Sequence, residues 1–399
     1  MQPIVSFVIS THNRREVLRS TLRRVQECGL APDQFEVLVV DNASSDSTAV
    51  AVAREFPTVH VMALDRNMGP CSKNLAIEEA KGEYIVFLDD DSYPLPGSIE
   101  RMISHFRNNE TLGAAIFTVT LPDGSHECCA YPDVFIGCGT GFRRQALAEV
   151  GGLPTDFFMA AEEYDLSLRL LDAGWDIRSF NDLHVIHMKT PASRSPWRLM
   201  RLDTRNNFLI ATRYFPPECT SIFTWDWMVR YYRIAAKRNQ RTAFVAGLGQ
   251  GMMRMFRKGH RKPVSDDTFD RFARVTQIQE ELQAATDQLG LKSVLFIDYG
   301  KNILPYWDAA MNLKLEIVGI ADRRLRGCGK YRGIPVIGDA EAVRLQFDAA
   351  IITTSSPVHA AERAAQWRRF DQRPVLDILT TYSRNSGEDE DQMRRGLAA

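Results

Sequence analysis

Three adjacent carboxylates, Asp89, Asp90 and Asp91, follow directly after the apolar run from Tyr84 to Leu88. A short continuous apolar run predicts a strand buried on both faces, as in a parallel sheet. Ligands of open α/β sheets bind beyond the carboxyl ends of the strands. Adjacent carboxylates repel one another, and a divalent cation that carries a polyphosphate would relieve this repulsion. For the three acids alone, a solvated acidic turn is the alternative interpretation.

Strands and helices alternate before this acidic run. Strands are predicted at Ile4–Ser10, Glu36–Val40 and Val59–Ala63, and helices at Arg14–Gln26, Thr48–Glu55 and Cys71–Ala80. This alternation predicts an α/β fold whose mostly parallel sheet carries helices on both faces. Polar clusters follow the three strands, at Thr11–Asn13, Asp41–Asn42 and Asn67–Gly69. Together with the acidic run, they are expected to line one edge of the sheet.

The chemistry of these clusters suits a nucleotide. Asp41 can accept a hydrogen bond from a base N–H group, and Lys73 can meet a phosphate. A cation on Asp91 would neutralise further phosphate charge. Taken singly, Asp41 is typical of a helix cap or a turn, and Lys73 is typical of a solvated surface. The inference therefore depends on the whole constellation.

The order of these segments resembles that of family 2 glycosyltransferases with the GT-A fold. The resemblance covers residues 4–190 and is carried by the segments VSFVISTHNR (5–14), VLVVDNASSDST (37–48), NMGPCSKNLAI (67–77), GEYIVFLDDDSYP (82–94) and GGLPTDFFMAAEEYDLSLRLLDAGWDI (151–177). The form VDNASSDST is similar to that of rhamnosyl and other cell-surface polysaccharide transferases.

The resemblance implies a donor-nucleotide site. Asp41 would contact uracil or thymine, Asp89 would lie near the ribose, and Lys73 would lie near the base or the phosphates. The remaining residues implied for the nucleotide are Thr11, Asn13, Asn67 and Asp90.

The resemblance also implies a metal site for Mn²⁺ or Mg²⁺. Asp91 would bind the cation as the second acid of a D-x-D motif, and His187 would complete the site. An isolated histidine is more often a satisfied core or surface residue, so this alternative stays open for His187.

Two later segments are implied to surround the donor sugar and the acceptor. Gly139, Thr140 and Gly141 belong to a loop that would lie under the donor sugar, although a plain turn is an equal alternative. After residue 161, acidic residues lie in the first turn of a predicted helix. The positive end of the helix dipole favours acids there, which is the alternative explanation for them.

In the family motif E-D-x-D-L, the second acid is the catalytic base. Glu163 holds that position, one methylene longer than the usual Asp, and Glu162 is the reserve candidate. Asp165 is expected to orient the loop or bind the acceptor.

Composition restricts the remaining possibilities. The chain has 399 residues and a net charge of −1, which gives no global attraction to nucleic acid. The seven cysteines are scattered without a C-x-x-C pair, which favours a reducing cytosol. No signal peptide and no apolar run long enough to span a bilayer is recognised. We therefore expect a cytoplasmic protein, peripheral on the cytoplasmic face of a membrane.

The membrane expectation comes from residues 194–262, which hold fifteen Lys and Arg but only three Asp and Glu. Interleaved aromatic residues and helical spacing suit an anionic membrane surface. The alternative is a helical subdomain with a solvated basic face. The predicted domains are a GT-A domain at 1–190, a basic helical segment at 191–290, a Rossmann-like domain at 291–385 and a disordered tail at 386–399.

The predicted Rossmann-like domain lacks the usual phosphate loop. Asp322 has the position of a ribose contact, but only Gly300 remains of a G-x-G-x-x-G motif, and Asp298 would repel a pyrophosphate. A role in packing or regulation is favoured over nucleotide binding. The missing glycines also argue against a dehydrogenase.

We therefore expect a metal-dependent, inverting glycosyltransferase. It would move a sugar from a UDP- or dTDP-sugar to a hydroxyl of a glycan or lipid-linked acceptor, in cell-surface polysaccharide synthesis. A sugar nucleotidyltransferase is the first alternative, but it would need a Gly-rich loop where this chain has THNRRE. The second alternative is a sugar-nucleotide-binding protein without turnover, which Glu in place of Asp at residue 163 favours.

Overall fold

The computed structural model describes residues 2–191 and 195–379. They divide into two compact units, and each unit is formed by segments that are not consecutive in the sequence. Unit 1 is formed by the residues up to Cys129, by Asp133–Thr224 and by Gln240–Thr268, and unit 2 by Ala130–Pro132, Trp225–Asn239 and the described residues from Phe269 onward. The basic segment is thus shared between the units, and the predicted tail at 386–399 lies outside the described residues.

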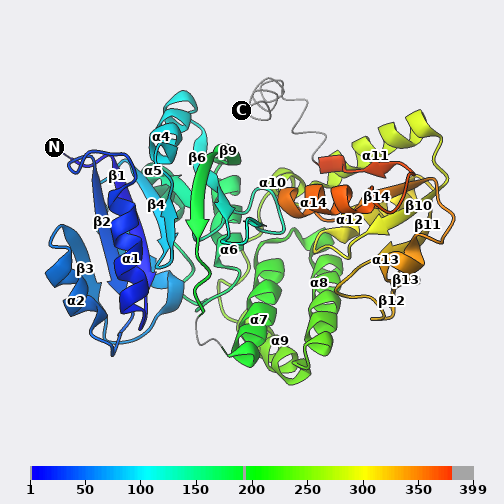
Figure 1. Ribbon diagram of the computed structural model, residues 1–399. Helices are drawn as coiled ribbons and strands as arrows, with labels where there is room; N and C mark the ends of the chain where they lie inside the picture. The colour runs from blue at the N-terminus through cyan, green and yellow to red at the C-terminus, as the bar shows by residue number, and fades with distance from the viewer. Residues whose placement is uncertain (1, 192–194, 380–399) are drawn as a thin grey trace. The chain divides into compact units, whose positions relative to one another are not determined.

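Unit 1 is built on a sheet with the strand order β3-β2-β1-β4-β8-β6-β9-β5, and β7 pairs with β6 (Figure 1). The strands are β1 Val5–Thr11, β2 Phe35–Asp41, β3 Val59–Ala63, β4 Tyr84–Asp89, β5 Ser92–Pro94, β6 Leu112–Thr120, β7 His126–Glu127, β8 Thr140–Arg143 and β9 Asp176–His187. The longest pairings, β1 with β2 and β4 and β6 with β9, are parallel. The predicted α/β class with a mostly parallel sheet is confirmed.

The register of the central strands sets the position of the polar clusters. Thr11 pairs with Asp41 across β1 and β2, and Ser10 pairs with Asp89 across β1 and β4. The apolar part of β4, from Tyr84 to Leu88, is at most 1% exposed at each residue. Burial on both faces fixes the register of such a strand, so its acidic end is held at the carboxyl edge of the sheet.

Helices cover both faces of this sheet (Figure 1). The helices that lie wholly in unit 1 are α1 Arg15–Gln26, α2 Thr48–Glu55, α3 Lys73–Glu79, α4 Ser98–Asn108, α5 Arg144–Val150, α6 Glu162–Asp172, α7 Pro196–Tyr214 and α9 Arg241–Met255, of which α9 packs on α7. Leu18, Leu22 and Val25 recur at helical spacing on α1 and are buried. The helix expected from Cys71 begins at Lys73, because Pro70 lies in a 3₁₀ turn, Gly69–Ser72, that precedes it.

Unit 2 contains a second sheet, with the strand order β12-β13-β11-β10-β14-β15. Its strands are β10 Ser293–Ile297, β11 Glu316–Ala321, β12 Lys330–Tyr331, β13 Ile334–Ile337, β14 Ala349–Ile352 and β15 Val375–Leu376. Its helices are α11 Val275–Leu289, α12 Ile303–Asn312, α13 Asp339–Ala342 and α14 Pro357–Trp367. Two further helices, α8 Pro217–Lys237 and α10 Asp266–Ala273, contain residues of both units.

The loop after β10 uses its acids internally. Asp298 forms an ion pair with Arg363 at 2.8 Å. The Asp322 carboxylate accepts hydrogen bonds from the backbone N–H groups of Tyr299, Arg324 and Leu325 at 2.6–2.8 Å. These contacts favour the packing role over nucleotide binding for this loop.

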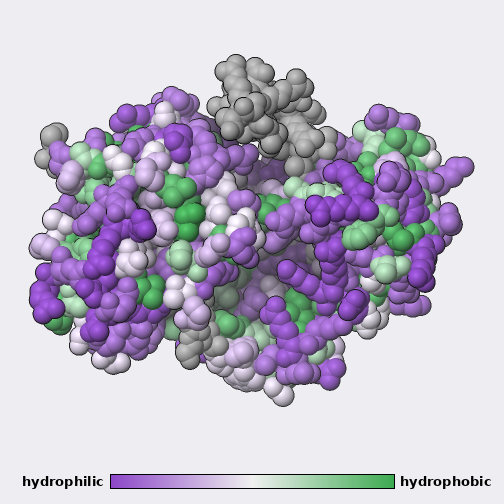
Figure 2. All heavy atoms as spheres, viewed as in Figure 1, coloured by the Kyte–Doolittle hydropathy of each residue, from purple (hydrophilic) through white to green (hydrophobic). Residues whose placement is uncertain are grey.

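None of the helices in the described part of the chain is both long and apolar enough to cross a membrane. On the face shown in Figure 2, hydrophilic residues predominate and apolar residues form small separate groups.

Gly300→Ala is expected to destabilise unit 2. A Cβ atom at Gly300 would lie 2.1 Å from the Thr353 carbonyl oxygen, and backbone atoms can yield only if the loop or the end of β14 moves. Overpacking of this kind costs about 1–3 kcal/mol. Urea unfolding of the full chain measures the loss. Gly338→Ala is the control in the same unit, because the nearest atom to its Cβ would be 3.5 Å away. Equal stability of the two variants would contradict this account.

Candidate active site in unit 1

A pocket of about 960 Å³ opens at the carboxyl edge of the unit 1 sheet. It is bounded by the ends of β1, β4 and β9 and by the starts of α6 and α7. Ten of the residues predicted to form the site line it: Thr11, Asn13, Asn67, Lys73, Asp89, Asp90, Asp91, Glu162, Glu163 and His187. Segments far apart in the sequence therefore converge on one cavity.

Asp41 lies behind the wall of this pocket. It is 3% exposed, and its carboxylate accepts a hydrogen bond from the Ser44 N–H at 3.1 Å. A contact between Asp41 and a base would require this turn to open. The neighbouring Asn42 lines the pocket instead, and its side chain holds Ser72 and the Met68 N–H.

The segment Gly139–Gly141 also lies outside the pocket lining. The Thr140 hydroxyl donates to the Ile136 carbonyl at 2.8 Å, and a Cβ at Gly141 would lie 2.2 Å from the Met102 sulfur on α4. These residues shape the start of β8, while Gly137 and Cys138 before them form the wall.

Asp165 is buried in an ion-pair cluster away from the pocket lining. Its carboxylate accepts from Arg169 at 2.9 Å, from Arg213 at 3.1 Å and from the Tyr214 hydroxyl at 2.7 Å. Because Arg213 and Tyr214 belong to α7, these contacts tie α6 to α7. Of its two predicted roles, this geometry offers the orienting one.

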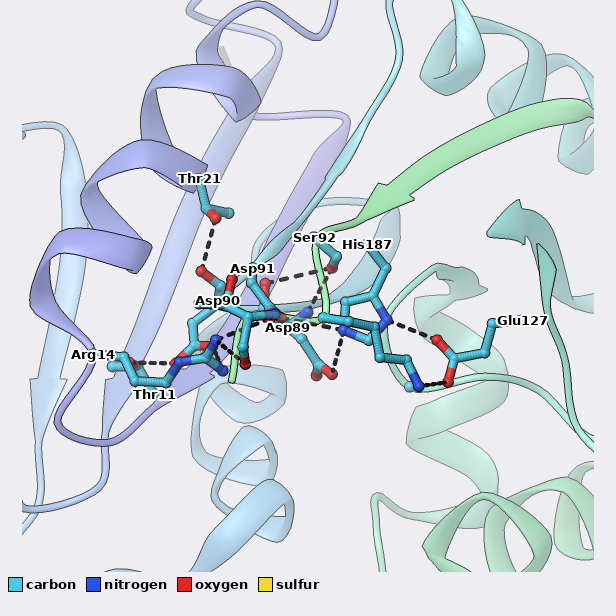
Figure 3. Close-up of polar contacts among 12 residues, drawn as sticks. Thr11, Arg14, Thr21, Asp89, Asp90, Asp91, Ser92, Glu127 and His187 are labelled. Atoms are coloured by element: carbon cyan, nitrogen blue, oxygen red, sulfur yellow. Dashed lines mark hydrogen bonds and ion pairs between the residues drawn. The ribbon is translucent and has the colours of Figure 1, made fainter. Parts of the chain in front are cut away.

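Asp90 points inward from the acidic run (Figure 3). Its carboxylate accepts from the Thr11 hydroxyl at 2.7 Å and pairs with Arg14 at 2.7 Å, while its carbonyl accepts from the Thr21 hydroxyl at 2.7 Å. Burial raises the pKa of Asp90 to about 6, although Arg14 and Thr11 act in the opposite direction. Asp90 thus fastens the acidic run to α1.

Asp91 lies between two cationic side chains. One carboxylate oxygen accepts from Arg14 at 2.9 Å and from the Thr190 N–H at 2.8 Å. The other oxygen is 3.2 Å from Nε2 of His187. Burial opposes ionisation, but hydrogen bonds from His187 and Arg14 hold the pKa of Asp91 well below its usual range.

Asp89 is the acid that faces the pocket, with 41% of its side chain exposed. Its carboxylate is 3.4 Å from Nζ of Lys73, a buried lysine that also donates to the Gly137 carbonyl at 3.0 Å. Lys73 is therefore held with its charge at the cavity wall rather than in solvent.

His187 is oriented by a carboxylate that the sequence did not indicate. Its Nδ1 lies 2.8 Å from Glu127, which also pairs with Lys189 at 2.5 Å (Figure 3). Burial disfavours the imidazolium, but hydrogen bonds to Asp91, Cys138 and Glu127 raise the pKa of His187 to about 12. With Nδ1 directed at Glu127, Nε2 is directed at the acidic run.

The donor set fits a divalent cation. Asp91 Oδ1 and His187 Nε2 are 3.2 Å apart, close to the ~3.0 Å between neighbouring ligands of an octahedral ion with bonds of about 2.1 Å. His187 Nε2 is also 4.0 Å from Asp89. Among the described residues, Asp89, Cys138 and His187 place their ligand atoms within 4.8 Å of one another. Because carboxylates predominate in this set, with one imidazole, it suits Mn²⁺ or Mg²⁺, whereas a thiolate-rich set would select a softer metal.

Two further carboxylates stand on the opposite wall, at the start of α6. Glu162 is buried, and one of its oxygens has no hydrogen-bond partner in the described part of the chain. Burial and the charge of Glu163 raise the pKa of Glu162 well above its usual range. Glu163 is partly exposed in the pocket wall, and burial, with a contribution from the Asp89 charge, raises its pKa to about 7.

The loop before α6 is held by a residue of α7. Ala160 and Ala161 both have positive φ angles, 71° and 64°, which non-glycine residues rarely adopt. The buried Asn206 side chain donates to the carbonyls of Met159 and Ala160 at 2.8 and 2.7 Å. Asn206 thereby fixes the loop that leads into α6, whose first two residues are Glu162 and Glu163.

Comparison with known proteins shows that part of the chain is similar to a known family. Residues 6–127 match the family model described as glycosyl transferase family 2. This segment is similar to glycosyltransferase family 2. The predicted resemblance is confirmed.

Individual relatives match over short stretches. The succinoglycan biosynthesis protein ExoO of Rhizobium meliloti is 39% identical over 105 residues, which are 25% of this chain and 29% of that protein. An undecaprenyl-phosphate 4-deoxy-4-formamido-L-arabinose transferase of Sodalis glossinidius is 36% identical over 105 residues, 25% of this chain and 32% of that protein. The chain thus spans about a third of these relatives. The crystal structure of S. aureus TarS aligns with a TM-score of 0.49 and 15% identity, over 78% of this chain and 55% of that one.

Three residues that shape the site were not predicted from the sequence: Arg14 and Glu127, which line the pocket, and Asn206, which holds the loop before α6. Arg14 directly follows Asn13, a predicted site residue, so its position next to one of the polar clusters could have indicated a place in the pocket. Nothing in the local sequence indicated Glu127 or Asn206, because their partners His187 and Ala160 lie 60 and 46 positions away.

Glu127→Gln is expected to weaken Mn²⁺ binding by about 10-fold, since loss of a carboxylate behind a metal-binding histidine typically costs 10–100-fold in affinity. The amide keeps the shape but removes the charge that orients His187. Calorimetric titration of Mn²⁺ in the presence of UDP measures the effect.

Asp123→Asn is the matched control, because Asp123 is an exposed carboxylate on the same hairpin and bonds only Ser125. Unchanged Mn²⁺ affinity in Glu127→Gln would show that Glu127 merely supports the hairpin.

Proposed function

We propose that this chain is a metal-dependent, inverting glycosyltransferase. Its donor would be a UDP- or dTDP-sugar, and its acceptor a hydroxyl of a glycan or lipid-linked molecule in cell-surface polysaccharide synthesis. The observation that carries the proposal is the convergence of four side chains on one pocket: Asp89 and Asp91, which lie inside the segment that matches family 2, and Glu163 and His187. The name of the Sodalis relative supports a lipid-linked acceptor.

The donor diphosphate would lie against the acidic run. Asp89, Asp91 and His187 would hold Mn²⁺ or Mg²⁺, which when bound offsets the charge that develops on the departing diphosphate. Lys73 lies in the pocket wall beside Asp89 and would contact the phosphates. Thr11, Asn13, Asn67 and the wall beside Asp90 would surround the nucleotide.

Glu163 would act as the general base. As the acceptor oxygen attacks the anomeric carbon, its proton passes to the Glu163 carboxylate, the new C–O bond forms and the bond from that carbon to the diphosphate oxygen breaks. Attack from the face opposite the leaving group inverts the anomeric centre. A base whose pKa lies near neutrality is matched to this task, which favours turnover over a binding protein that has lost its chemistry.

Asp91→Ala tests the donor site. Micromolar binding of UDP or dTDP that depends on Mn²⁺ is expected for the wild type, and the variant should lose the metal-dependent part, at least ~10-fold in affinity. Calorimetry with both nucleotides, with and without Mn²⁺, measures this. Asp182→Asn is the control, since that carboxylate pairs with His105 outside the pocket lining. Failure of the wild type to bind either nucleotide would refute the proposal.

Glu163→Gln tests the base. Release of UDP or dTDP from a panel of sugar nucleotides should fall about 10²–10⁴-fold, while nucleotide affinity is kept. Glu162→Gln is the paired variant. A large loss in Glu162→Gln with normal turnover in Glu163→Gln would transfer the role to Glu162, and binding without turnover in the wild type would favour the sugar-nucleotide-binding alternative.

The wild-type rate should depend on pH in a defined direction. The base works only when deprotonated, so a pKa raised to about 7 means that the rate rises as pH increases through about 7. The pH profile of kcat/KM measures this limb. A limb near the ordinary glutamate value of about 4.3 would contradict the assignment.

A further inference from the structure

Helix α9 is apolar around most of its circumference. Residues 242–253 include no charged side chain. One side of the helix packs closely on α7, where a Cβ at Gly247 would lie 2.4 Å from the Arg201 carbonyl oxygen and one at Gly251 would lie 2.7 Å from the Phe208 ring. This close approach fixes which side of α9 faces inward.

The opposite side of α9 is apolar and exposed. Val245, Met252, Met253 and Phe256 are 64%, 49%, 70% and 79% exposed, and we call these four residues the α9 face. At 100° per residue they fall within an arc of about 100°, the width of the apolar stripe that helices normally bury. A group of large apolar side chains left in water marks an interaction site.

Positive charge frames the α9 face. Arg241 precedes it, Arg257, Lys258 and Lys262 follow it, and all four are exposed. The sequence has no acidic residue between Asp226 and Asp266. A second copy of this chain would bring like charges together at this surface, whereas an anionic surface would complement them.

A tryptophan adjoins the α9 face beside the pocket. Trp197 is 42% exposed, and its indole N–H donates to the Thr242 hydroxyl at 3.1 Å. The same turns of α7 supply Arg198, Leu199 and Leu202 to the pocket lining. Figure 1 shows α7 and α9 side by side. Tryptophan prefers the boundary between an apolar phase and water.

We propose that the α9 face binds the surface of a membrane that contains anionic lipids. The four apolar side chains enter the boundary between headgroups and acyl chains, while the framing arginines and lysines meet lipid phosphates. The pocket rim then lies beside the bilayer, so a lipid-linked acceptor could present its headgroup while its tail stays in the membrane. The proposal is argued from the α9 face and the residues that adjoin it, and it does not depend on the proposed enzymatic activity.

Co-sedimentation of the full chain with vesicles tests the proposal. The vesicles are phosphatidylcholine alone or phosphatidylcholine with about 30% phosphatidylglycerol. Binding to the anionic vesicles should be at least ~10-fold stronger and should weaken at high salt. Met253→Glu with Phe256→Glu, and separately Arg257→Glu with Lys258→Glu, should each reduce it at least ~10-fold.

Val50→Glu is the matched control, because Val50 is a 72% exposed apolar residue on α2. It should bind anionic vesicles as the wild type does, and circular dichroism should show all variants folded. The proposal is overturned if the wild type ignores anionic vesicles, or if the Met253 and Phe256 variant binds like the control. It is also overturned if that variant abolishes a dimer seen by sedimentation velocity but leaves vesicle binding intact.

Discussion

The mutual repulsion of three adjacent carboxylates at the end of β4 is the constraint on which the site depends. The fold resolves it by sending the acids in different directions. Asp90 turns inward to Thr11 and Arg14, Asp91 lies between Arg14 and His187, and Asp89 faces the pocket beside Lys73. The three cations come from the starts of α1 and α3 and from the end of β9. In a low dielectric these attractions are strong, so charge balance at one strand end also ties the walls of the pocket together.

Pairing between backbone strands holds these side chains in position without a ligand. β5 pairs antiparallel with β9, so Ser92 lies opposite His187, and the Met188 N–H donates to the Asp91 carbonyl at 2.9 Å. The residue after the acidic run and the proposed metal-binding histidine are thus fixed by the same ladder. Glu127 then sets the ring orientation. Such a donor set needs little movement of the backbone to accept a cation, and the cation would displace the proton on Nε2 of His187.

The parts of the fold that depend on local pattern could be predicted from the sequence. The apolar run of β4 and the alternation before it identified a parallel sheet, and therefore an edge where Thr11 and Asp89 meet. Features that depend on the path of a turn could not be predicted. Asp41 looks available for a base, but Ala43 adopts a φ of 57° and the turn brings the Ser44 N–H onto the carboxylate. For Asp165 the sequence left two roles open, orienting the loop or binding the acceptor, because its partners on α7 are 48 and 49 positions away and cannot be inferred from the local sequence.

The two glutamates of α6 differ in their surroundings because of where one turn of helix begins. Consecutive helical residues point about 100° apart, so only one of the pair can face the pocket fully. Burial and the charge of Glu163 both disfavour ionisation of Glu162, which therefore keeps its proton more readily than Glu163. A carboxylate that stays protonated can donate a hydrogen bond, whereas the partly exposed Glu163 is the residue that we propose as the base. Asn206 fixes this division, because it holds the carbonyls of Met159 and Ala160 and so sets the residue at which the helix starts.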